Sequence, residues 1–168
     1  MKKELITVSP NEARVRSIVE MVVLREKRIQ VNDKDEFTSL NVEDYYEIIK
    51  ELTTAIINLD GYKTLSHKAL FTYLKDHYLE FSSADHILID ELRKTRNKIA
   101  YEGFFIKSWY LRKNDIYIKQ IVQKLRAIIK QKMNSDLDKR FKESKHIRPR
   151  HNFSAGEMDE LVENEVLR

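Results

Sequence analysis

Cysteine is missing from this 168-residue chain, and glycine and proline are scarce, with three and two residues respectively. The absence of cysteine excludes disulfide frameworks, thiolate metal sites and a thiol nucleophile. Sheets joined by tight turns normally need more glycine and proline than this chain contains. The scarcity of both residue types therefore favours long helices with few breaks.

Long apolar runs and glycine-rich motifs are missing as well. No run approaches the roughly 18 apolar residues of a membrane-spanning helix, and the amino-terminal stretch MKKELITVSPNEARVR lacks the apolar core of a secretory signal. We therefore expect a cytoplasmic protein without a membrane segment. Glycine-rich phosphate loops are excluded because no two glycines lie within ten residues of each other, and the Gly-x-Ser-x-Gly elbow of hydrolases is absent.

The five histidines show none of the spacings that bind metal on a helix, such as His-Glu-x-x-His. His77 and His86 flank a turn that also contains three acidic residues, Asp76, Glu80 and Asp85. Polar residues gathered at a surface turn explain this cluster better than a metal site does. The sequence therefore predicts no metal and no cofactor.

The length corresponds to one domain, and 42% hydrophobic with 35% charged residues is typical of a globular protein. The charge is distributed unevenly, because residues 93–132 contain 12 Lys and Arg against Glu102 and Asp115, a net charge of +10. A stretch this basic is suited to a polyanion, with nucleic acid first. A solvated, lysine-rich helix face is an equally good reading of the charge alone.

Helical periodicity extends along most of the chain and predicts an all-α, up-and-down antiparallel bundle of four to five helices over residues 1–133. Capping patterns indicate several ends: Ser9 and Pro10 begin the first helix, Gly61 ends the second, Ser82 begins the fourth and Gly103 ends it. The expected helices span about residues 10–28, 42–60, 66–78, 83–102 and 115–133, with Asn114 as the cap of the last.

Two segments between and after these helices have a different character. Residues 104–111 are rich in aromatic and apolar side chains, so we expect them to pack on the bundle or across a subunit interface. Residues 134–168 have weak periodicity and blocks of opposite charge. They are predicted to form a charged carboxy-terminal appendage that is mobile or docked on a partner.

The stretch LRKTRNKIAYEGFFI, residues 92–106, is the most informative in the chain. With Leu88, Leu92, Thr95 and Ile99 as the core face of the fourth helix, a helical wheel turns four other residues away from the core. These are Arg93, Arg96, Asn97 and Tyr101, which would then face solvent or a partner. A charged helix end with no role beyond solubility is the simpler reading of the same residues.

Arg96-Asn97 followed by Tyr101 resembles the motif of the HEPN domain family (higher eukaryotes and prokaryotes nucleotide-binding). In that family an Arg, often followed by Asn or Asp, precedes a His by four to six residues near the end of a late helix. The resemblance covers roughly residues 10–132 and implies a four- to five-helix bundle that dimerises. It also implies RNA or nucleotide binding, and in some members a toxin–antitoxin pairing with a minimal nucleotidyltransferase.

The departure from the motif is that Tyr101 holds the His position. In HEPN ribonucleases the Arg and His of two subunits meet and cleave RNA without metal. A base must take the 2′-hydroxyl proton and a cation must stabilise the phosphorane. Arg96 suits the second task, whereas a phenol with a pKa near 10 is only about one part in a thousand ionised at pH 7. Ribonuclease activity would therefore be weak or lost.

The residues singled out fall into two groups. The candidate catalytic residues are Arg96, Asn97 and Tyr101. The candidate nucleic-acid-binding residues are Arg93, Arg96, Lys98, Lys107, Arg112 and Lys113. The alternative function is a non-catalytic interaction module that docks a protein partner through its basic segment and charged tail.

Overall fold

The computed structural model describes the backbone of residues 4–144 and the side chains up to residue 135. It contains five helices: α1 (Glu12–Val31), α2 (Thr38–Leu59), α3 (His67–His77), α4 (Ser83–Glu102) and α5 (Trp109–Ser144). Two short strands, β1 (Ile6–Thr7) and β2 (Tyr62–Lys63), form an antiparallel pair. The predicted all-α helical bundle is confirmed.

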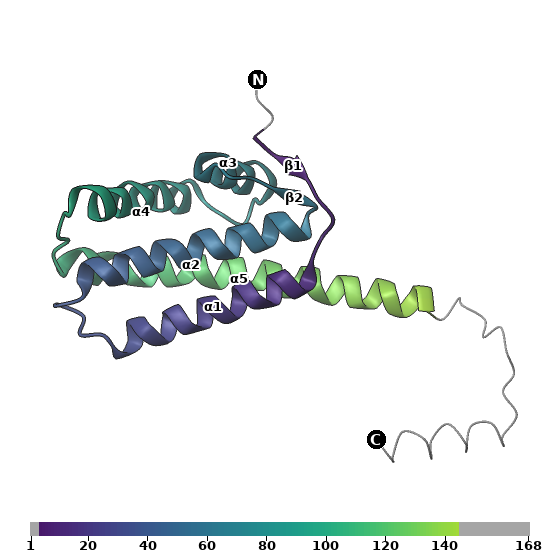
Figure 1. Ribbon diagram of the computed structural model, residues 1–168, viewed down its shortest axis with the longest axis horizontal. Coiled ribbons are helices and arrows are strands. Elements are labelled where there is room, and N and C mark those ends of the chain that lie inside the picture. Colours follow the sequence, from purple (N-terminus) through teal and green to yellow (C-terminus); the bar gives the residue numbers. More distant parts are fainter. Residues whose placement is uncertain (1–3, 145–168) are drawn as a thin grey trace, which may run out of the picture. The chain divides into compact units, whose positions relative to one another are not determined.

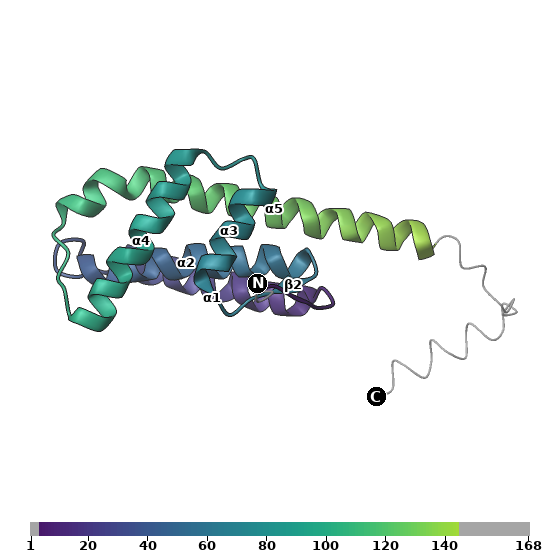
Figure 2. The same ribbon diagram turned by 90° about the horizontal axis from the view of Figure 1, so that it is seen from above.

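Helix α2 lies at the centre of the bundle. It packs against α1, α3 and α4, and Figure 1 shows α1 on one side of it with α3 and α4 on the other. Seen from above, α4 runs obliquely across α2 (Figure 2). The core consists mainly of apolar side chains from α2 and α5, including Ile49, Leu52, Ile56, Ile121 and Leu125, which are fully buried.

Most helix ends in the described part of the chain follow capping signals in the local sequence. A capping box begins α4, in which Ser82 and Asp85 exchange hydrogen bonds, and Gly103 ends it in the left-handed conformation at φ 63°. Gly61 follows α2 with φ 85°, as its position predicts. The cap of α1 is Asn11 rather than Ser9, because the Asn11 side chain accepts from the Arg14 amide at 2.9 Å.

Two helices begin earlier than their sequences suggest. Helix α2 begins at Thr38 rather than near residue 42, because a turn over residues 33–37 leads into it and the Thr38 hydroxyl donates to Lys34 O at 2.7 Å. Helix α5 begins at Trp109, so Asn114 is not its cap and instead donates to Tyr110 O from within the helix. Burial of Tyr110 fixes this earlier start.

The pair of strands was not expected from the sequence. Each strand has two residues, too few to show the alternation that marks a strand. Val8 N donates to Gly61 O at 2.8 Å beside the pair, which ties the segment before α1 to the end of α2.

The chain divides into two units between Met133 and Asn134. Helix α5 continues to Ser144, beyond the end near Met133 that the weakening apolar pattern predicted. Residues 145–168 of the predicted appendage lie outside the described residues. Every helix in the described part of the chain is too short or too polar to cross a lipid bilayer.

Candidate functional site

The orientation of α4 decides where the Arg96 motif lies. The buried residues of α4 are Ile89 and Leu92, whereas Leu88 and Ile99 are only partly buried. The predicted core face is therefore rotated by about one residue. Arg96 follows Ile89 by two helical turns and Leu92 by one, so it lies on the side of α4 that faces α2. The prediction that Arg96 points away from the bundle was wrong.

Arg96 is half-buried against α2. Its side chain is 24% exposed, and its Nη2 atom lies 3.4 Å from Oε1 of Glu47. Arg96 Nε and Glu47 Oε1 are both buried without a hydrogen-bond partner. On its outer side, the guanidinium lies 5.9 Å from the centre of the Tyr101 ring, within the range of a cation–π contact. The ion pair thus leaves hydrogen-bonding capacity on the guanidinium that an anion would satisfy.

Arg93 lies one turn before Arg96 and is also partly buried. It donates two hydrogen bonds to Asp90 on the same helix, at 3.0 and 2.8 Å. Lys94 pairs with the other oxygen of Asp90 at 2.7 Å. Hydrogen bonds from Lys94 and Arg93 hold the pKa of Asp90 below its usual value.

Two further elements bring residues to this site that the motif does not contain. On α2, Lys50 pairs with Glu47, the same carboxylate that faces Arg96. His67 is the first residue of α3, and its Nδ1 atom is hydrogen-bonded to the Tyr46 hydroxyl at 2.9 Å. Arg96, Arg93 and Tyr101 all act electrostatically on Tyr46.

The environment of His67 favours the neutral imidazole. Burial lowers the pKa of His67, and so do the positive charges of Lys50, Arg96 and Arg93, while Glu47 opposes them. Burial also raises the pKa of Tyr46 to about 12, so the phenol beside the imidazole keeps its proton. The result is a neutral imidazole among three cations, which we name the Arg96 site: Tyr46, Glu47, Lys50, His67, Arg93, Arg96.

Sequence reasoning missed Tyr46, Lys50 and His67. His67 is 29 positions before Arg96 in the chain, and it was considered only as a metal ligand. No local signal links the two residues, because their proximity depends on how α3 and α4 pack on α2.

The other two predicted catalytic residues lie at the edge of this site. Tyr101 is 78% exposed and contacts Arg96 through its ring. Asn97 is partly buried, and its side chain makes no hydrogen bond with any described residue. Tyr101 is therefore placed to cover Arg96 rather than to enter the cluster around His67.

The predicted nucleic-acid-binding residues do not form one group. Arg93 and Arg96 belong to the Arg96 site. Arg112 is paired with Asp35 at 2.7 Å and lines a different cavity. The remaining three are exposed and form no ion pair within residues 4–135: Lys98, Lys107 and Lys113.

A groove of about 500 Å³ connects Arg96 with the charged side chains of α1 and α2. Arg25 and Arg28 line it, and both pair with Asp44, whose side chain is only 3% exposed. Arg25 pairs in addition with Glu51 at 3.0 Å. The basic residues that line the groove are thus paired with carboxylates. The Arg96–Glu47 pair is the longest of these ion pairs, at 3.4 Å, and Arg96 Nε has no hydrogen-bond partner.

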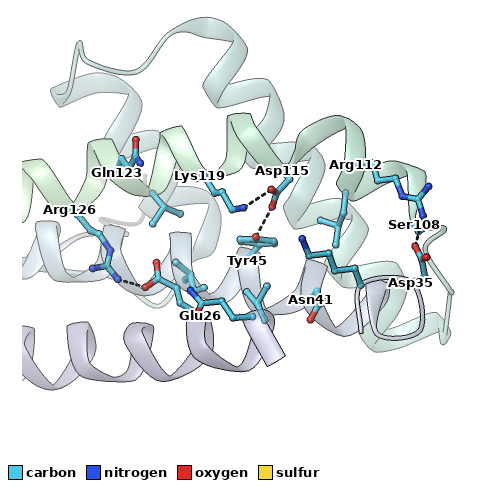
Figure 3. A pocket seen from close by; sticks show the side chains of 16 residues that line it. Glu26, Asp35, Asn41, Tyr45, Ser108, Arg112, Asp115, Lys119, Gln123 and Arg126 are labelled. Atoms are coloured by element: carbon cyan, nitrogen blue, oxygen red, sulfur yellow. Dashed lines mark hydrogen bonds and ion pairs between the residues drawn. The ribbon is translucent and has the colours of Figure 1, made fainter. Parts of the chain in front are cut away.

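A larger cavity, of about 870 Å³, lies between α1, α2 and α5 (Figure 3). Arg126 reaches from α5 to Glu26 at 2.6 Å. Near the middle, the Tyr45 hydroxyl and Lys119 both donate to Asp115, each at 2.6 Å. Burial opposes ionisation of Asp115, yet the hydrogen bonds from Lys119 and Tyr45 hold its pKa below the usual value.

The Arg112–Asp35 pair closes one end of this cavity (Figure 3). Hydrogen bonds from Arg112 and Ser108 lower the pKa of Asp35. Each of the three carboxylates in the wall therefore has its own cation. The size is that of a small-molecule pocket, but three of the four cations in its wall, Arg112, Lys119 and Arg126, are already paired with carboxylates, which disfavours a phosphate there.

The histidine cluster considered from sequence is dispersed. His77 stacks on Tyr73 with ring centres 4.0 Å apart and bonds to its carbonyl oxygen, and His86 lies near Phe81. Within the described residues no group of three His, Cys, Asp or Glu side chains is placed to hold a metal ion.

Comparison of the chain with protein-family models gives no match, and comparison with curated proteins gives none either.

Proposed function

We propose that this protein is a HEPN-like RNA- or nucleotide-binding protein whose phosphate contacts are made at the Arg96 site. The observation that carries the proposal is that Lys50 of α2 and Arg96 of α4 share the carboxylate of Glu47, while the buried Nε of Arg96 has no hydrogen-bond partner. Arg93 adds a third positive charge that acts on the same His67. A guanidinium binds two phosphate oxygens side by side, and it stays charged at any physiological pH. A phosphate that replaced Glu47 would occupy both Arg96 Nε and Nη2.

The resemblance of Arg96-Asn97 and Tyr101 to the HEPN motif supports the same function. The proposal includes the partners that the resemblance implies, namely a second copy of the chain and a minimal nucleotidyltransferase. It also includes a weak, metal-independent ribonuclease activity. Tyr101 is a poor base, whereas the neutral imidazole of His67 supplies a base at Nε2 in the tautomer whose Nδ1–H donates to the Tyr46 oxygen.

The cleavage that such a site would perform needs no cofactor. The ribose 2′-oxygen attacks the adjacent phosphorus and gives its proton to a base. The bond from phosphorus to the 5′-oxygen then breaks, and that oxygen takes up a proton. The products are a 2′,3′-cyclic phosphate and a 5′-hydroxyl. Arg96 would stabilise the charge on the phosphorane oxygens.

Binding is tested first, with a fluorescein-labelled RNA titrated by the full-length protein at several salt concentrations. We expect affinity to fall by about 0.7 log units per log unit of salt for each phosphate contacted. Arg96→Ala should weaken binding about tenfold or more, whereas Arg16→Ala, which removes an exposed arginine from α1, should leave it unchanged. No affinity at low salt would sink the proposal.

Cleavage is tested separately, with the same RNA in the presence of a chelator. We expect slow cleavage by the wild type, none by Arg96→Ala, less by His67→Ala and more by Tyr101→His. Cleavage that persists in Arg96→Ala would assign the activity to another site or to a contaminant. Binding without any cleavage would leave an RNA-binding protein and remove only the ribonuclease part.

The second candidate function is a non-catalytic module that docks a protein partner. The observation in its favour is the set of exposed aromatic side chains between Tyr101 and Tyr117. It predicts that the purified protein has no measurable affinity for RNA at low salt, so the binding titration also decides between the two functions.

A further inference from the structure

Five aromatic side chains within 17 consecutive residues are exposed to solvent. The most exposed are Phe105 at 85% and Tyr101 at 78%, followed by Trp109 at 61%. Phe104 and Tyr117 are more than half exposed as well. Single exposed apolar residues are normal, but a concentration of this kind marks an interaction surface. We name these five residues the aromatic face: Tyr101, Phe104, Phe105, Trp109, Tyr117.

The backbone that presents the aromatic face is held in place by its neighbours. Gly103 turns the chain at the end of α4, and Phe104 N donates to Lys98 O at 3.2 Å. Ile106 N donates to the Ser39 hydroxyl of α2 at 2.8 Å, and Tyr110 is buried in the bundle. The rings at 104, 105 and 109 therefore point outward from an ordered segment, and little entropy is lost when a ligand covers them.

Lysines alternate with these rings along the chain: Lys98 precedes Tyr101 by three residues, Lys107 lies between Phe105 and Trp109, and Lys113 lies between Trp109 and Tyr117. Lys98, Lys107 and Lys113 are exposed and form no ion pair with any residue of the described chain. On α5, Trp109 and Lys113 are one turn apart and therefore lie on the same face of the helix. At its other end, the aromatic face meets the Arg96 site, because the Tyr101 ring lies 5.9 Å from the Arg96 guanidinium.

This combination favours one kind of occupant over a second copy of the chain. A two-fold interface through this surface would bring the unpaired lysines of both copies together, and lysine is depleted from such interfaces. Rings separated by free cations instead match a chain of unpaired bases joined by phosphates. A double helix or a sulfated polysaccharide has the charge but offers no accessible base faces.

We propose that the aromatic face binds single-stranded RNA by stacking bases on Phe105 and Trp109, while Lys98, Lys107 and Lys113 contact the flanking phosphates. This inference rests on the proposed function, since it assumes that RNA is the ligand. The bound strand would run from the rings past Tyr101 to Arg96. The binding free energy would then have two separable contributions, base stacking on the aromatic face and phosphate binding at the Arg96 site.

The chain supplies its own reporter, because Trp109 is its only tryptophan. The full-length protein is titrated with a single-stranded 12-nucleotide RNA, the same sequence as a duplex, and heparin, while tryptophan fluorescence is recorded. We expect strong quenching by the single strand and little by the duplex or by heparin. Phe105→Leu, which keeps an apolar side chain but removes the ring, should weaken single-strand binding by about 5- to 150-fold.

Leu79→Ala is the control, because Leu79 is 94% exposed but lies outside the aromatic face. It should leave RNA affinity unchanged. Since Phe105 is itself exposed, its substitution should not disturb the fold, and the circular dichroism spectrum checks this.

The outcomes separate this inference from the proposed function. If RNA binding depends on Arg96 while Phe105→Leu and Trp109 fluorescence show no effect, the stacking surface is wrong and the phosphate site stands. Binding of single strand, duplex and heparin with equal affinity would also overturn stacking. If no RNA binds, both fail. If sedimentation shows a dimer that Phe105→Leu dissociates, the aromatic face belongs to a second copy of the chain.

Discussion

Helices α2 and α4 have nearly the same length, 22 and 20 residues, but opposite surroundings. Fifteen residues of α2 are buried and only two of α4. Because α2 is enclosed on several sides, even its polar residues, such as Asp44 and Thr53, are buried and hydrogen-bonded. Helix α4 packs along a narrow stripe, and the rest of its surface is available for arginine and lysine. The comparison separates the helix that holds the fold from the helix that presents the candidate site.

The largest effect is expected from truncating the core of α2. Leu52 is completely buried, so Leu52→Ala should lower the free energy of unfolding by about 2–5 kcal/mol. Leu88→Ala on α4 removes the same atoms from a half-buried position and should cost less than about 2 kcal/mol. Urea unfolding followed by circular dichroism measures both. Equal losses would contradict the division of roles between the helices.

A charge in each helix makes the comparison sharper. Asp44 on α2 is buried between Arg25 and Arg28, so Asp44→Ala should destabilise the protein by about 2 kcal/mol, since it removes charged hydrogen bonds to both arginines while Arg25 keeps Glu51. Asp90 on α4 also has two cationic partners but is 48% exposed, and Asp90→Ala should cost less than about 1 kcal/mol. The same unfolding experiment decides, and a large loss for Asp90→Ala would show that α4 is not a mere surface helix.

The smallest expected effect is a pH dependence of stability from His67, the first residue of α3, which is hydrogen-bonded to Tyr46 of α2 and lies within the electrostatic range of Arg96 of α4. The pKa of His67 is lowered in the fold from the ordinary value of 6.5, so the unfolded chain binds its proton more readily. Stability from this group is therefore complete above pH 6.5 and is lost as the pH falls toward the lowered value. We expect the wild type to be less stable at pH 5.5 than at pH 7.5, and His67→Gln to lose part of that difference.

His86 provides the matched control for this measurement. Its pKa is also lowered, first by burial and then by Lys75, but it lies outside the Arg96 site. His86→Gln should remove only the part of the pH dependence that comes from His86. The double variant His67→Gln/His86→Gln should therefore lose the sum of the two contributions. A pH profile of His67→Gln identical to the wild type would mean that His67 titrates normally.

Much of the fold could be predicted because its signals are local. The capping box at Ser82 and the left-handed Gly103 follow from short-range hydrogen bonding and from the conformational freedom of glycine. The start of α5 could not be read in this way. A plausible cap at Asn114 was overridden by the burial of Tyr110, a tertiary effect.

Only part of the candidate site could be predicted from the sequence, because its local motif is readable but the orientation of its helix is a tertiary effect. The motif identified Arg96, but Leu88 and Ile89 are both apolar, and the sequence does not say which of them faces the core. The choice of Ile89 turns Arg96 inward toward Glu47 and decides its environment. The contribution of His67 could not be predicted at all, since it comes from another helix.

The sequence by itself determined that the chain forms long helices, where most of them end, and that the 40 residues from 93 to 132, about a quarter of the chain, are strongly basic. These properties depend on residues close together in the chain. Only the tertiary structure decided that Arg96 is paired and half-buried, that His67 of α3 lies close enough for Arg96 and Arg93 to act on its charge, and that the rings from 101 to 117 remain exposed. Each of these depends on how α3, α4 and α5 pack on α2, and packing is set by contacts between distant residues.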